Sequence, residues 1–405
     1  MKNILKYILL FLILSFSSCK EEFTPEIIDF QTALVVEANI SDNLEIQSIK
    51  LSKTMRLEEE EPLIEDNAEI TVLSNDGENH QFSQGTNGVY YSNTAFSAKP
   101  DVYYSLLIET SDGKVYQSSE VKLPEEAMLT NVYAEKITKN DVEGIQVYAD
   151  SKGSANNGTY FRYQYEETYE IESPYYSGFE ASLKNIIQFG ETYDVEVTLG
   201  NEIGEGRICY SSNFSHGINQ ITTSNLAENL AEAVPIRFID GKDPIIRERF
   251  SIKVIQYTES PEAYSFYKIL NDLGSSESIF SQNQPGAIQG NIYNTANSED
   301  LVIGYFDVAL KESKRIFFNH EDFNIPTPAY FYDCETITYD YKDNLPVPFD
   351  GDLNERQALY EALKNNEYEI VPEQTEEELI YTIVRTECAN CTSFSSKTKP
   401  EFWID

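Results

Sequence analysis

The segment "YFRYQYEETYEI", residues 160–171, carries the pattern on which the predicted fold rests. Apolar and aromatic side chains alternate along it with polar ones. One face would carry Phe161, Tyr163, Tyr165, Tyr169 and Ile171, and the other Arg162, Gln164, Glu166, Thr168 and Glu170. Because successive side chains of a strand point to opposite faces, this period predicts a half-buried β-strand. We expect its aromatic rings to pack in a core or across strands, with stacking on sugars as the alternative.

Residues 32–124, which precede this strand, predict a separate β-domain. Short β-rich runs such as "ALVVEANI" and "AEITVLS" alternate there with turn residues. The clearest hairpin joins "VYYSLLIET" to "KVYQSSEV" through Asp112 and Gly113, which can supply the positive φ angles of a tight turn. About seven strands in roughly ninety residues is the density of an immunoglobulin-like or fibronectin-like sandwich.

Residues 130–405 predict a larger β-rich domain with small helical insertions, joined to the sandwich by the linker "LPEEAM". One helix is expected at 261–273, because Ser260 can cap its start and Gly274 can end it. The fold class is therefore mainly β, with an N-terminal sandwich followed by the larger domain.

A second helix is expected at 353–365. It follows Asp352, which forms a capping-box-like pair with Glu355. The same acidic stretch has some of the oxygen ligands of a calcium loop. Glu355, however, stands where such a loop needs glycine for its turn, so the cap is the favoured interpretation.

The composition excludes one large class of partners. Lys and Arg together number 30 and Asp and Glu 68, giving a formal net charge of −38 over 405 residues. Such a charge repels phosphate backbones, so nucleic acid is not expected as a partner. Hydrophobic content of 41% is ample for a packed core, and the acidity therefore describes a surface. The densest acidic run, Glu58–Glu61, is expected to be a solvated loop, with a divalent-cation site as the alternative.

The N-terminal residues predict export and a lipid anchor. Residues 1–18 contain two lysines, then an apolar run too short to span a bilayer, then small residues before Cys19. A lipoprotein signal peptidase cleaves before such a cysteine, and the acylated thiol anchors the mature chain. We therefore interpret 1–18 as a lipoprotein signal peptide, Cys19 as the lipidated residue and 19–31 as a tether. An ordinary secretory leader is the alternative.

Three charged residues follow the predicted lipidation site. Lys20, Glu21 and Glu22 resemble the surface-export signal of Bacteroidota-type lipoproteins. The resemblance implies that the protein crosses the outer membrane and faces the cell exterior. The alternative is a solvated charged linker.

Four cysteines remain after Cys19. They are Cys209, Cys334, Cys388 and Cys391. In an oxidising compartment an even number favours disulfides, while a redox pair or half a zinc site at "CANC" are the alternatives. A bond between Cys388 and Cys391 would close a very small loop, whereas a bond from Cys334 closes more than about fifty residues, worth about 4 kcal/mol. We predict that Cys334 pairs with Cys388 or Cys391 and Cys209 with the other, which would pin Trp403 against the second domain.

No catalytic motif is evident. The histidines His80, His216 and His320 are isolated, and no zinc-protease, nucleophile-elbow, phosphate-loop or dinucleotide pattern is present. Paired carboxylates are uninformative among so many acidic residues. We expect a protein that is not an enzyme and that needs no cofactor or metal.

Several sequence blocks together carry a family resemblance. They are "LVVEANI", "YFRYQYEETYEIESPY", Cys209-Tyr210, "PIRFI", "SPEAYSFYKIL", "QPGAIQGNI", "LVIGYFDV" with "KRIFF", and "CANC" with "KPEFW". In this order they resemble the domain-of-unknown-function 4249 family, lipoproteins typical of Bacteroidota and often encoded beside TonB-dependent receptors. Cys334, Cys388 and Cys391 match that family's late cysteines, whereas "TSFSSKTKPEFW" departs from its arginine-rich ending.

The resemblance implies a function without a reaction. The first hypothesis is a non-enzymatic surface lipoprotein that helps a TonB-dependent β-barrel transporter to capture a nutrient. The second is an adhesion or envelope-assembly protein with no transported ligand. The third is a surface hydrolase that uses carboxylates without a recognisable motif.

Overall fold

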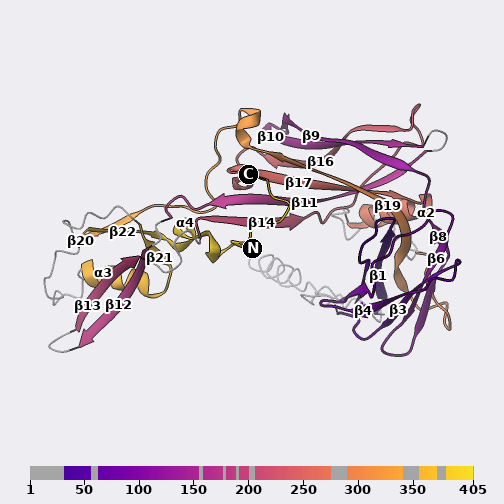
Figure 1. The fold of residues 1–405 in the computed structure, drawn as a ribbon, viewed down its shortest axis with the longest axis horizontal. Helices are drawn as coiled ribbons and strands as arrows, with labels where there is room; N and C mark the ends of the chain where they lie inside the picture. Colours follow the sequence, from indigo (N-terminus) through magenta and orange to yellow (C-terminus); the bar gives the residue numbers. More distant parts are fainter. Residues whose placement is uncertain are drawn as a thin grey trace, which may run out of the picture.

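The computed structural model describes residues 32–55, 63–154, 158–176, 179–187, 191–199, 206–274, 290–340, 355–371 and 380–404. The signal peptide, Cys19, the Lys20–Glu22 segment, Glu58–Glu61 and Asp352 lie outside this description. The chain is mainly β and forms three units along its long axis. Figure 1 shows the N-terminal sandwich at one end, a second β-unit in the middle and a small lobe at the other end.

The N-terminal sandwich is built from the strands that follow the tether. They are β1 Leu34–Ser41, β2 Ser48–Lys53, β3 Glu69–Ser74, β4 His80–Gln84, β5 Val89–Ser92, β6 Tyr103–Glu109, β7 Val115–Ser118 and β8 Val121–Lys122. The predicted hairpin is β6–β7, and Gly113 has the positive φ of 81° that its turn requires. Side chains at alternate positions of these strands point inward and form the core, among them Val36, Ile40, Leu106 and Ile108.

A distant segment completes this sandwich. Strands β18 (Ile292–Asn294) and β19 (Val302–Phe318) pair with β7 and β1, and β19 is parallel to β1. Phe306 and Val308 belong to the sandwich core. The sequence analysis placed this segment in the second domain, so the sandwich is larger than residues 32–124 and is built from two stretches of chain.

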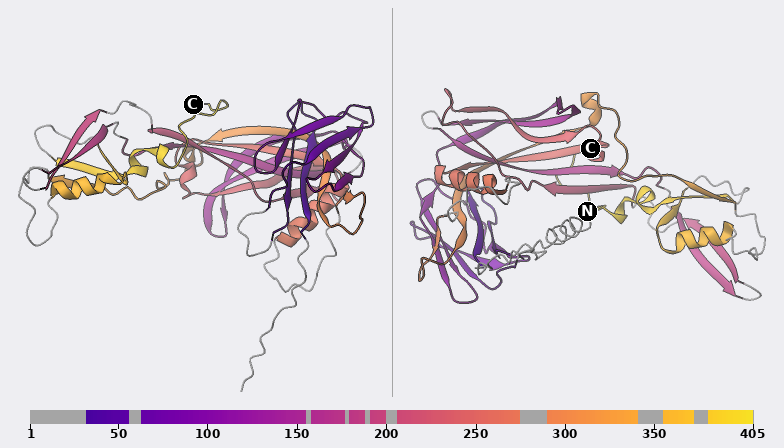
Figure 2. Two further views of the ribbon diagram at one scale, coloured as in Figure 1. Left: turned by 90° about the horizontal axis from the view of Figure 1, so that it is seen from below. Right: turned by 180° about the vertical axis from the view of Figure 1, so that it is seen from behind.

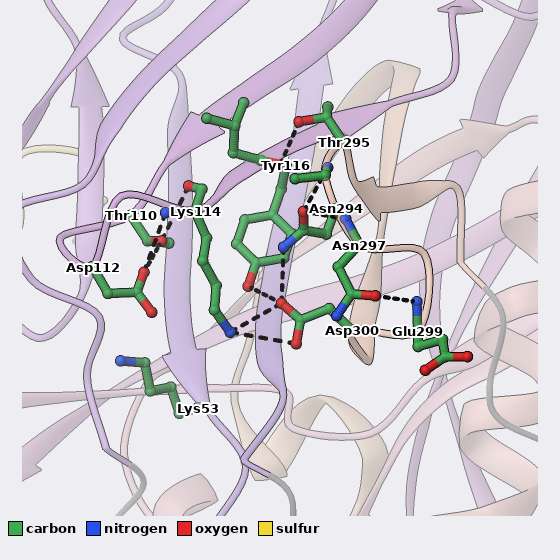
Figure 3. Close-up of polar contacts among 12 residues, drawn as sticks. Lys53, Thr110, Asp112, Lys114, Tyr116, Asn294, Thr295, Asn297, Glu299 and Asp300 are labelled. Carbon is green, nitrogen blue, oxygen red and sulfur yellow. Dashed lines mark hydrogen bonds and ion pairs between the residues drawn. The ribbon is translucent and has the colours of Figure 1, made fainter.

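A polar cluster fixes this distant segment to the β6–β7 hairpin. Asp300 accepts hydrogen bonds from Lys114 Nζ at 3.0 Å, Tyr116 OH at 3.1 Å and Asn294 Nδ2 at 2.8 Å (Figure 3). Burial, together with the bond to Asp300, raises the pKa of Tyr116 to about 12. The cluster therefore joins residues that are far apart in the sequence.

The second unit has two sheets that face each other. One contains β11 (Tyr160–Glu172), β14 (Ile208–Phe214), β15 (Asn219–Thr222), β17 (Phe250–Glu259) and the end of β19, and the other contains β9 (Ala127–Lys139), β10 (Val142–Gly153) and β16 (Leu230–Asp240). Side chains such as Phe161, Ile145, Val147 and Ile252 form its core. Strand β19 pairs with β1 through residues 302–309 and with β17 through residues 310–318, so one strand runs through both units.

The strand predicted at 160–171 is β11, and the prediction of its buried face is confirmed. Phe161, Tyr163, Tyr169 and Ile171 are buried, and Tyr165, the fifth predicted residue, is partly buried against the same core. The opposite face differs from the expectation of a solvated surface, because Arg162 is also buried. Helix α2 (Pro261–Gly274) covers that end of the strand.

Both predicted helices are present. Helix α2 begins after Ser260, whose Oγ accepts a hydrogen bond from the backbone N–H of Ala263 at 3.1 Å, as a capping residue does. The helix predicted at 353–365 is α3, Glu355–Lys364.

The small lobe at the far end contains α3. Its other elements are β12 (Phe179–Ile187), β13 (Glu191–Leu199), β20 (Ile337–Asp340), β21 (Tyr368–Ile370), β22 (Ile380–Arg385) and the short α4 (Thr386–Ala389). Leu359, Leu363, Ile370 and Ile383 form a small core of their own. In Figure 2 this lobe again lies at the opposite end of the molecule from the sandwich.

Two disulfides lie where the small lobe meets the second unit. Cys334 pairs with Cys388, and Cys209 pairs with Cys391, which is one of the two arrangements predicted from loop lengths. Of the two cysteines of "CANC", Cys388 therefore bonds within the small lobe, whereas Cys391 bonds to Cys209 on β14 of the second unit. Trp403 is buried against Tyr210 and Phe317, at ring distances of 5.1 and 5.6 Å, as predicted for the terminal segment.

Candidate functional site

The candidate site is a cleft of about 750 Å³ between the sandwich and the second unit. We call it the interdomain cleft. The outward face of β1 and part of β2 form one wall, and β11, β17, α2 and the loop 215–218 form the other. The shared strand β19 closes its end with Ile303 and Lys311. The wall from β1 and β2 carries polar and aliphatic side chains, whereas Tyr257 and Tyr267 lie on the opposite wall. A few polar groups set among apolar and aromatic surface can orient a ligand.

Arg162 is the central side chain of the cleft. It projects from β11 and is only 6% exposed. Its Nε donates a hydrogen bond to Glu259 at the end of β17. The guanidinium carbon lies 4.5 Å from the ring centre of Tyr257 and 4.7 Å from that of Tyr267. Two aromatic rings and one carboxylate therefore hold this cation in a single orientation.

The partners of Arg162 are themselves fixed. Gln220 Nε2 donates a 3.0 Å hydrogen bond to the second oxygen of Glu259. Burial disfavours the charge on Arg162, but attraction by Glu259 outweighs that effect and raises the pKa of Arg162. Burial also raises the pKa of Tyr267 to about 12, against the opposing effect of Arg162. The arginine is thus a permanent cation and the tyrosine a neutral ring at neutral pH.

A second carboxyl group lies behind this pair. Asp307, on β19, is fully buried, and its Oδ1 accepts a hydrogen bond from Ser260 Oγ at 3.2 Å. Burial, reinforced by the nearby charge of Glu259, raises the pKa of Asp307 to about 8. This carboxyl group is therefore mainly protonated at neutral pH, and the ion pair of Arg162 with Glu259 stays close to electrically balanced.

Two polar atoms near this cluster have no partner among the described residues. They are Oδ2 of Asp307 and Nδ2 of Asn39. Asn39 and Asp307 are paired in register on the adjacent parallel strands β1 and β19, and Asn39 also lines the interdomain cleft. A buried polar atom without a partner costs free energy, so such atoms in a folded protein call for an explanation.

The rim of the cleft is charged but largely paired. Lys311 Nζ lies 2.8 Å from Glu45 and Lys50 Nζ lies 3.2 Å from Glu37. Although burial opposes it, hydrogen bonds from Lys311 and Ser41 keep the pKa of Glu45 below its ordinary value. These rim pairs leave Arg162 as the cation at the bottom of the cleft.

A second hollow of about 980 Å³ lies on the other side of the Arg162 and Glu259 pair. Its lining is acidic and includes Asp42, Glu125, Glu126, Glu259 and Glu312. Within the described part of the chain, no group of three or more His, Cys, Asp or Glu side chains has a metal-binding arrangement. Also within that part, no helix is long and apolar enough to cross a membrane.

Comparison with known families identifies the chain. The sequence profile described as "Domain of unknown function (DUF4249)" matches residues 20–315. The chain belongs to the DUF4249 family. The search of curated proteins found no match. The matched range contains every cleft residue described above, whereas Cys334, Cys388, Cys391 and most of the small lobe lie beyond it.

The residues singled out in the sequence lie in several places. The four cysteines that follow Cys19 form the two disulfides, and none of them lines the interdomain cleft. His80 stacks on Phe96 at 3.7 Å and His320 Nδ1 contacts the carbonyl oxygen of Ile325 at 2.8 Å, so both have structural contacts. His216, by contrast, lies in the loop that lines the interdomain cleft.

The residues at the centre of the cleft were not predicted from the sequence. Arg162 was expected on the polar face of a strand, and Asn39, Glu259 and Asp307 were not singled out. A usable signal was present, because Arg162 stands between two aromatic residues and Glu259 directly precedes the cap of α2. Neither pattern shows that the two side chains meet.

Proposed function

We propose that this DUF4249 protein is a non-enzymatic, lipid-anchored surface protein that captures a ligand in the interdomain cleft for a TonB-dependent transporter. Cys19 would carry the lipid, and Lys20, Glu21 and Glu22 would direct the protein to the outer face of the outer membrane. The sequence pattern of the leader and the family membership support this location.

The observation that carries the proposal is the fixed orientation of Arg162. Desolvating an arginine and a carboxylate is costly, and a well-packed apolar pair in their place is often no less stable. The chain nevertheless holds this cation on three sides and directs it to a cleft. That arrangement supports recognition of a ligand better than a purely architectural role.

The carboxyl groups of the cluster do not favour the hydrolase hypothesis. A hydrolytic pair needs one carboxyl group to reach the substrate oxygen and the other to reach water or the sugar carbon. Both oxygens of Glu259 already accept hydrogen bonds, from Arg162 and Gln220, and Asp307 is enclosed completely. We therefore propose binding rather than catalysis at this site.

A capture experiment tests the proposed partner. The full-length protein, expressed from its native locus with a C-terminal tag, is solubilised in mild detergent and purified, and its companions are identified by mass spectrometry. We expect a β-barrel receptor to be recovered. Its repeated absence would contradict the proposal of a transporter partner.

The anchor is tested separately. Cys19→Ser should abolish acylation and release the protein from the membrane fraction. Replacing Lys20, Glu21 and Glu22 with alanine should keep acylation but reduce cleavage by protease added outside the cells. Unchanged cleavage would reject the export signal.

Gene deletion separates uptake from the adhesion or envelope-assembly hypothesis. A growth defect confined to one nutrient supports capture. A general defect in attachment or in the envelope supports the alternative instead.

A further inference from the structure

We infer that the interdomain cleft recognises a carboxylate group on its ligand through the terminal nitrogens of Arg162. This inference rests on the proposed ligand-binding function and names the chemistry of the ligand. The ligand would be a small organic acid or a peptide with a free carboxyl terminus, of a size set by the cleft of about 750 Å³.

Part of the Arg162 guanidinium is left open. A guanidinium has two faces, an Nε edge and a terminal edge with the two Nη groups. The rings of Tyr257 and Tyr267 pack against the guanidinium, and Glu259 binds its Nε. Glu259 is the only hydrogen-bond partner of the Arg162 side chain among the described residues. The terminal edge, which lies at the wall of the cleft, is therefore the part available to a ligand.

The terminal edge of an arginine binds groups that carry two acceptor oxygens. The two Nη groups present parallel N–H donors in a plane, a geometry that matches the two oxygens of a carboxylate. Because the Arg162 orientation is fixed before binding, little side-chain entropy is lost when the pair forms. Lysine could supply the charge but not the paired donors.

Asn39 lines the same cleft but adds no donor to it. Its Nδ2 is closed to solvent, and so is Oδ2 of Asp307, its in-register neighbour on β19. Neither atom has a partner among the described residues, and a small rotation of the two side chains would join this donor to this acceptor. Arg162 therefore supplies the donors that recognise the ligand, and Asn39 serves as a control position in the same wall.

The charge of the surroundings sharpens the selectivity. The whole chain carries a formal charge of −38, so anions are repelled from most of its surface. In the cleft the rim lysines are paired and Asp307 is mainly protonated, so a bound carboxylate meets Arg162 without a free carboxylate beside it. Binding of an anion here therefore depends on this one arginine.

The probes are matched pairs that differ only in charge. Ligand-observed ¹⁹F NMR is recorded with the folded mature protein and 4-fluorobenzoate, and separately with 4-fluorobenzamide. A second pair is a fluorophenylalanine-containing tripeptide with a free carboxyl terminus and its carboxamide. We expect line broadening for at least one acid, with the neutral partner at least tenfold weaker. Equal broadening of both members of each pair, or no broadening by any acid, overturns the inference.

Three variants locate the binding. Arg162→Lys keeps the charge but loses the paired donors, and should weaken acid binding at least tenfold. Asn39→Ala removes an amide nitrogen that is closed to solvent, so acid binding should change by less than about threefold. Arg207→Lys is the matched control, because Arg207 is exposed and pairs with Glu172 outside the cleft. Its binding should equal that of the unmodified protein.

A double variant tests the same inference if Arg162→Lys does not fold. Arg162→Met combined with Glu259→Gln removes both buried charges together, so no unpaired charge remains. If this variant folds and still binds the acids in preference to the amides, the inference is wrong. If the acids bind as expected but no transporter is recovered in the capture experiment, the proposed function fails while the carboxylate site stands.

Discussion

The two junctions between units of this molecule are held in different ways. The junction of the second unit with the small lobe is crossed by the disulfide Cys209–Cys391, and Cys334–Cys388 lies beside it within the lobe. The junction of the sandwich with the second unit has the shared strand β19 and the buried pair of Arg162 and Glu259. A disulfide restricts the unfolded chain and makes few demands on solvation, whereas buried charges are costly to desolvate. We infer that the first junction serves as a clamp, whereas the second, in our proposal, keeps charged groups for binding a ligand.

Removing the clamp should have the largest effect. The bond from Cys209 to Cys391 spans 182 residues, so the chain-entropy model assigns it about 5 kcal/mol. We expect Cys209→Ala with Cys391→Ala to lower the free energy of unfolding by an amount of that order. Urea unfolding followed by tryptophan fluorescence measures it, because Trp403 packs on Tyr210 next to Cys209. A loss below about 1 kcal/mol would contradict the role of a clamp.

Breaking the charged pair on one side should cost somewhat less. Glu259→Ala leaves Arg162 buried without its carboxylate and should destabilise the protein by about 3–5 kcal/mol. Arg162→Met with Glu259→Gln removes both charges and should cost much less. Chemical unfolding of the two variants gives the comparison. If the double variant is as unstable as Glu259→Ala, the pair has an architectural role that our account does not include.

The pH dependence of the cleft cluster should be smaller than these losses within any one pH unit. The pKa of Asp307 is raised to about 8 in the fold, from 3.8, so the folded state holds a proton that the unfolded state has lost. Its contribution to stability is complete below about pH 4 and is lost as the pH rises to about 8, at up to about 1.4 kcal/mol per pH unit.

Asp307→Asn isolates this contribution. The difference in unfolding free energy between Asp307→Asn and the unmodified protein should move in favour of the variant as the pH rises from 4 to 8, and should be constant above about pH 9. Unfolding curves at four pH values measure it. A difference independent of pH would show that Asp307 is ionised throughout.

The smallest effect is expected at an exposed contact of the sandwich. Lys114 and Asp300 form an ion pair at 3.0 Å with the lysine side chain 45% exposed. Exposed pairs contribute little, so Lys114→Ala should change the free energy of unfolding by less than about 1 kcal/mol. Asp300→Ala should cost more, since it also removes the acceptor of Tyr116 and Asn294. Equal losses for both variants would contradict the structural importance given to Asp300.

Local patterns in the sequence predicted the parts of the fold that depend on neighbours in the chain. The alternation in β11, the turn at Gly113 and the cap at Ser260 all involve residues a few positions apart. The expected compartment and the loop lengths reduced the disulfide pairing to two arrangements, and the structure has one of them. The pairing of β1 with β19 was not predicted, because it joins residues about 270 positions apart and the apolar run at 302–310 does not show which sheet it enters.

The same limit applies to the site. Arg162 was expected on a solvated face, since alternation describes a strand but not what later covers it. Helix α2, about 100 residues further along the chain, brings Tyr267 onto that face, and β17 brings Glu259. Burial of the arginine is thus a tertiary property. The cysteines were visible because disulfide chemistry depends on residue type, whereas a binding arginine depends on its surroundings.

Hydrogen–deuterium exchange with and without 4-fluorobenzoate, or whichever acid binds best, tests the contrast between the junctions most directly. Exchange is followed by mass spectrometry on peptides from β1, β11 and α2 and on peptides from residues 380–404. Our account predicts slower exchange in the first group when the acid is present, and unchanged exchange at the disulfide junction. Protection confined to residues 380–404, or absent from β1, β11 and α2, would contradict the claim that the interdomain cleft is the binding site.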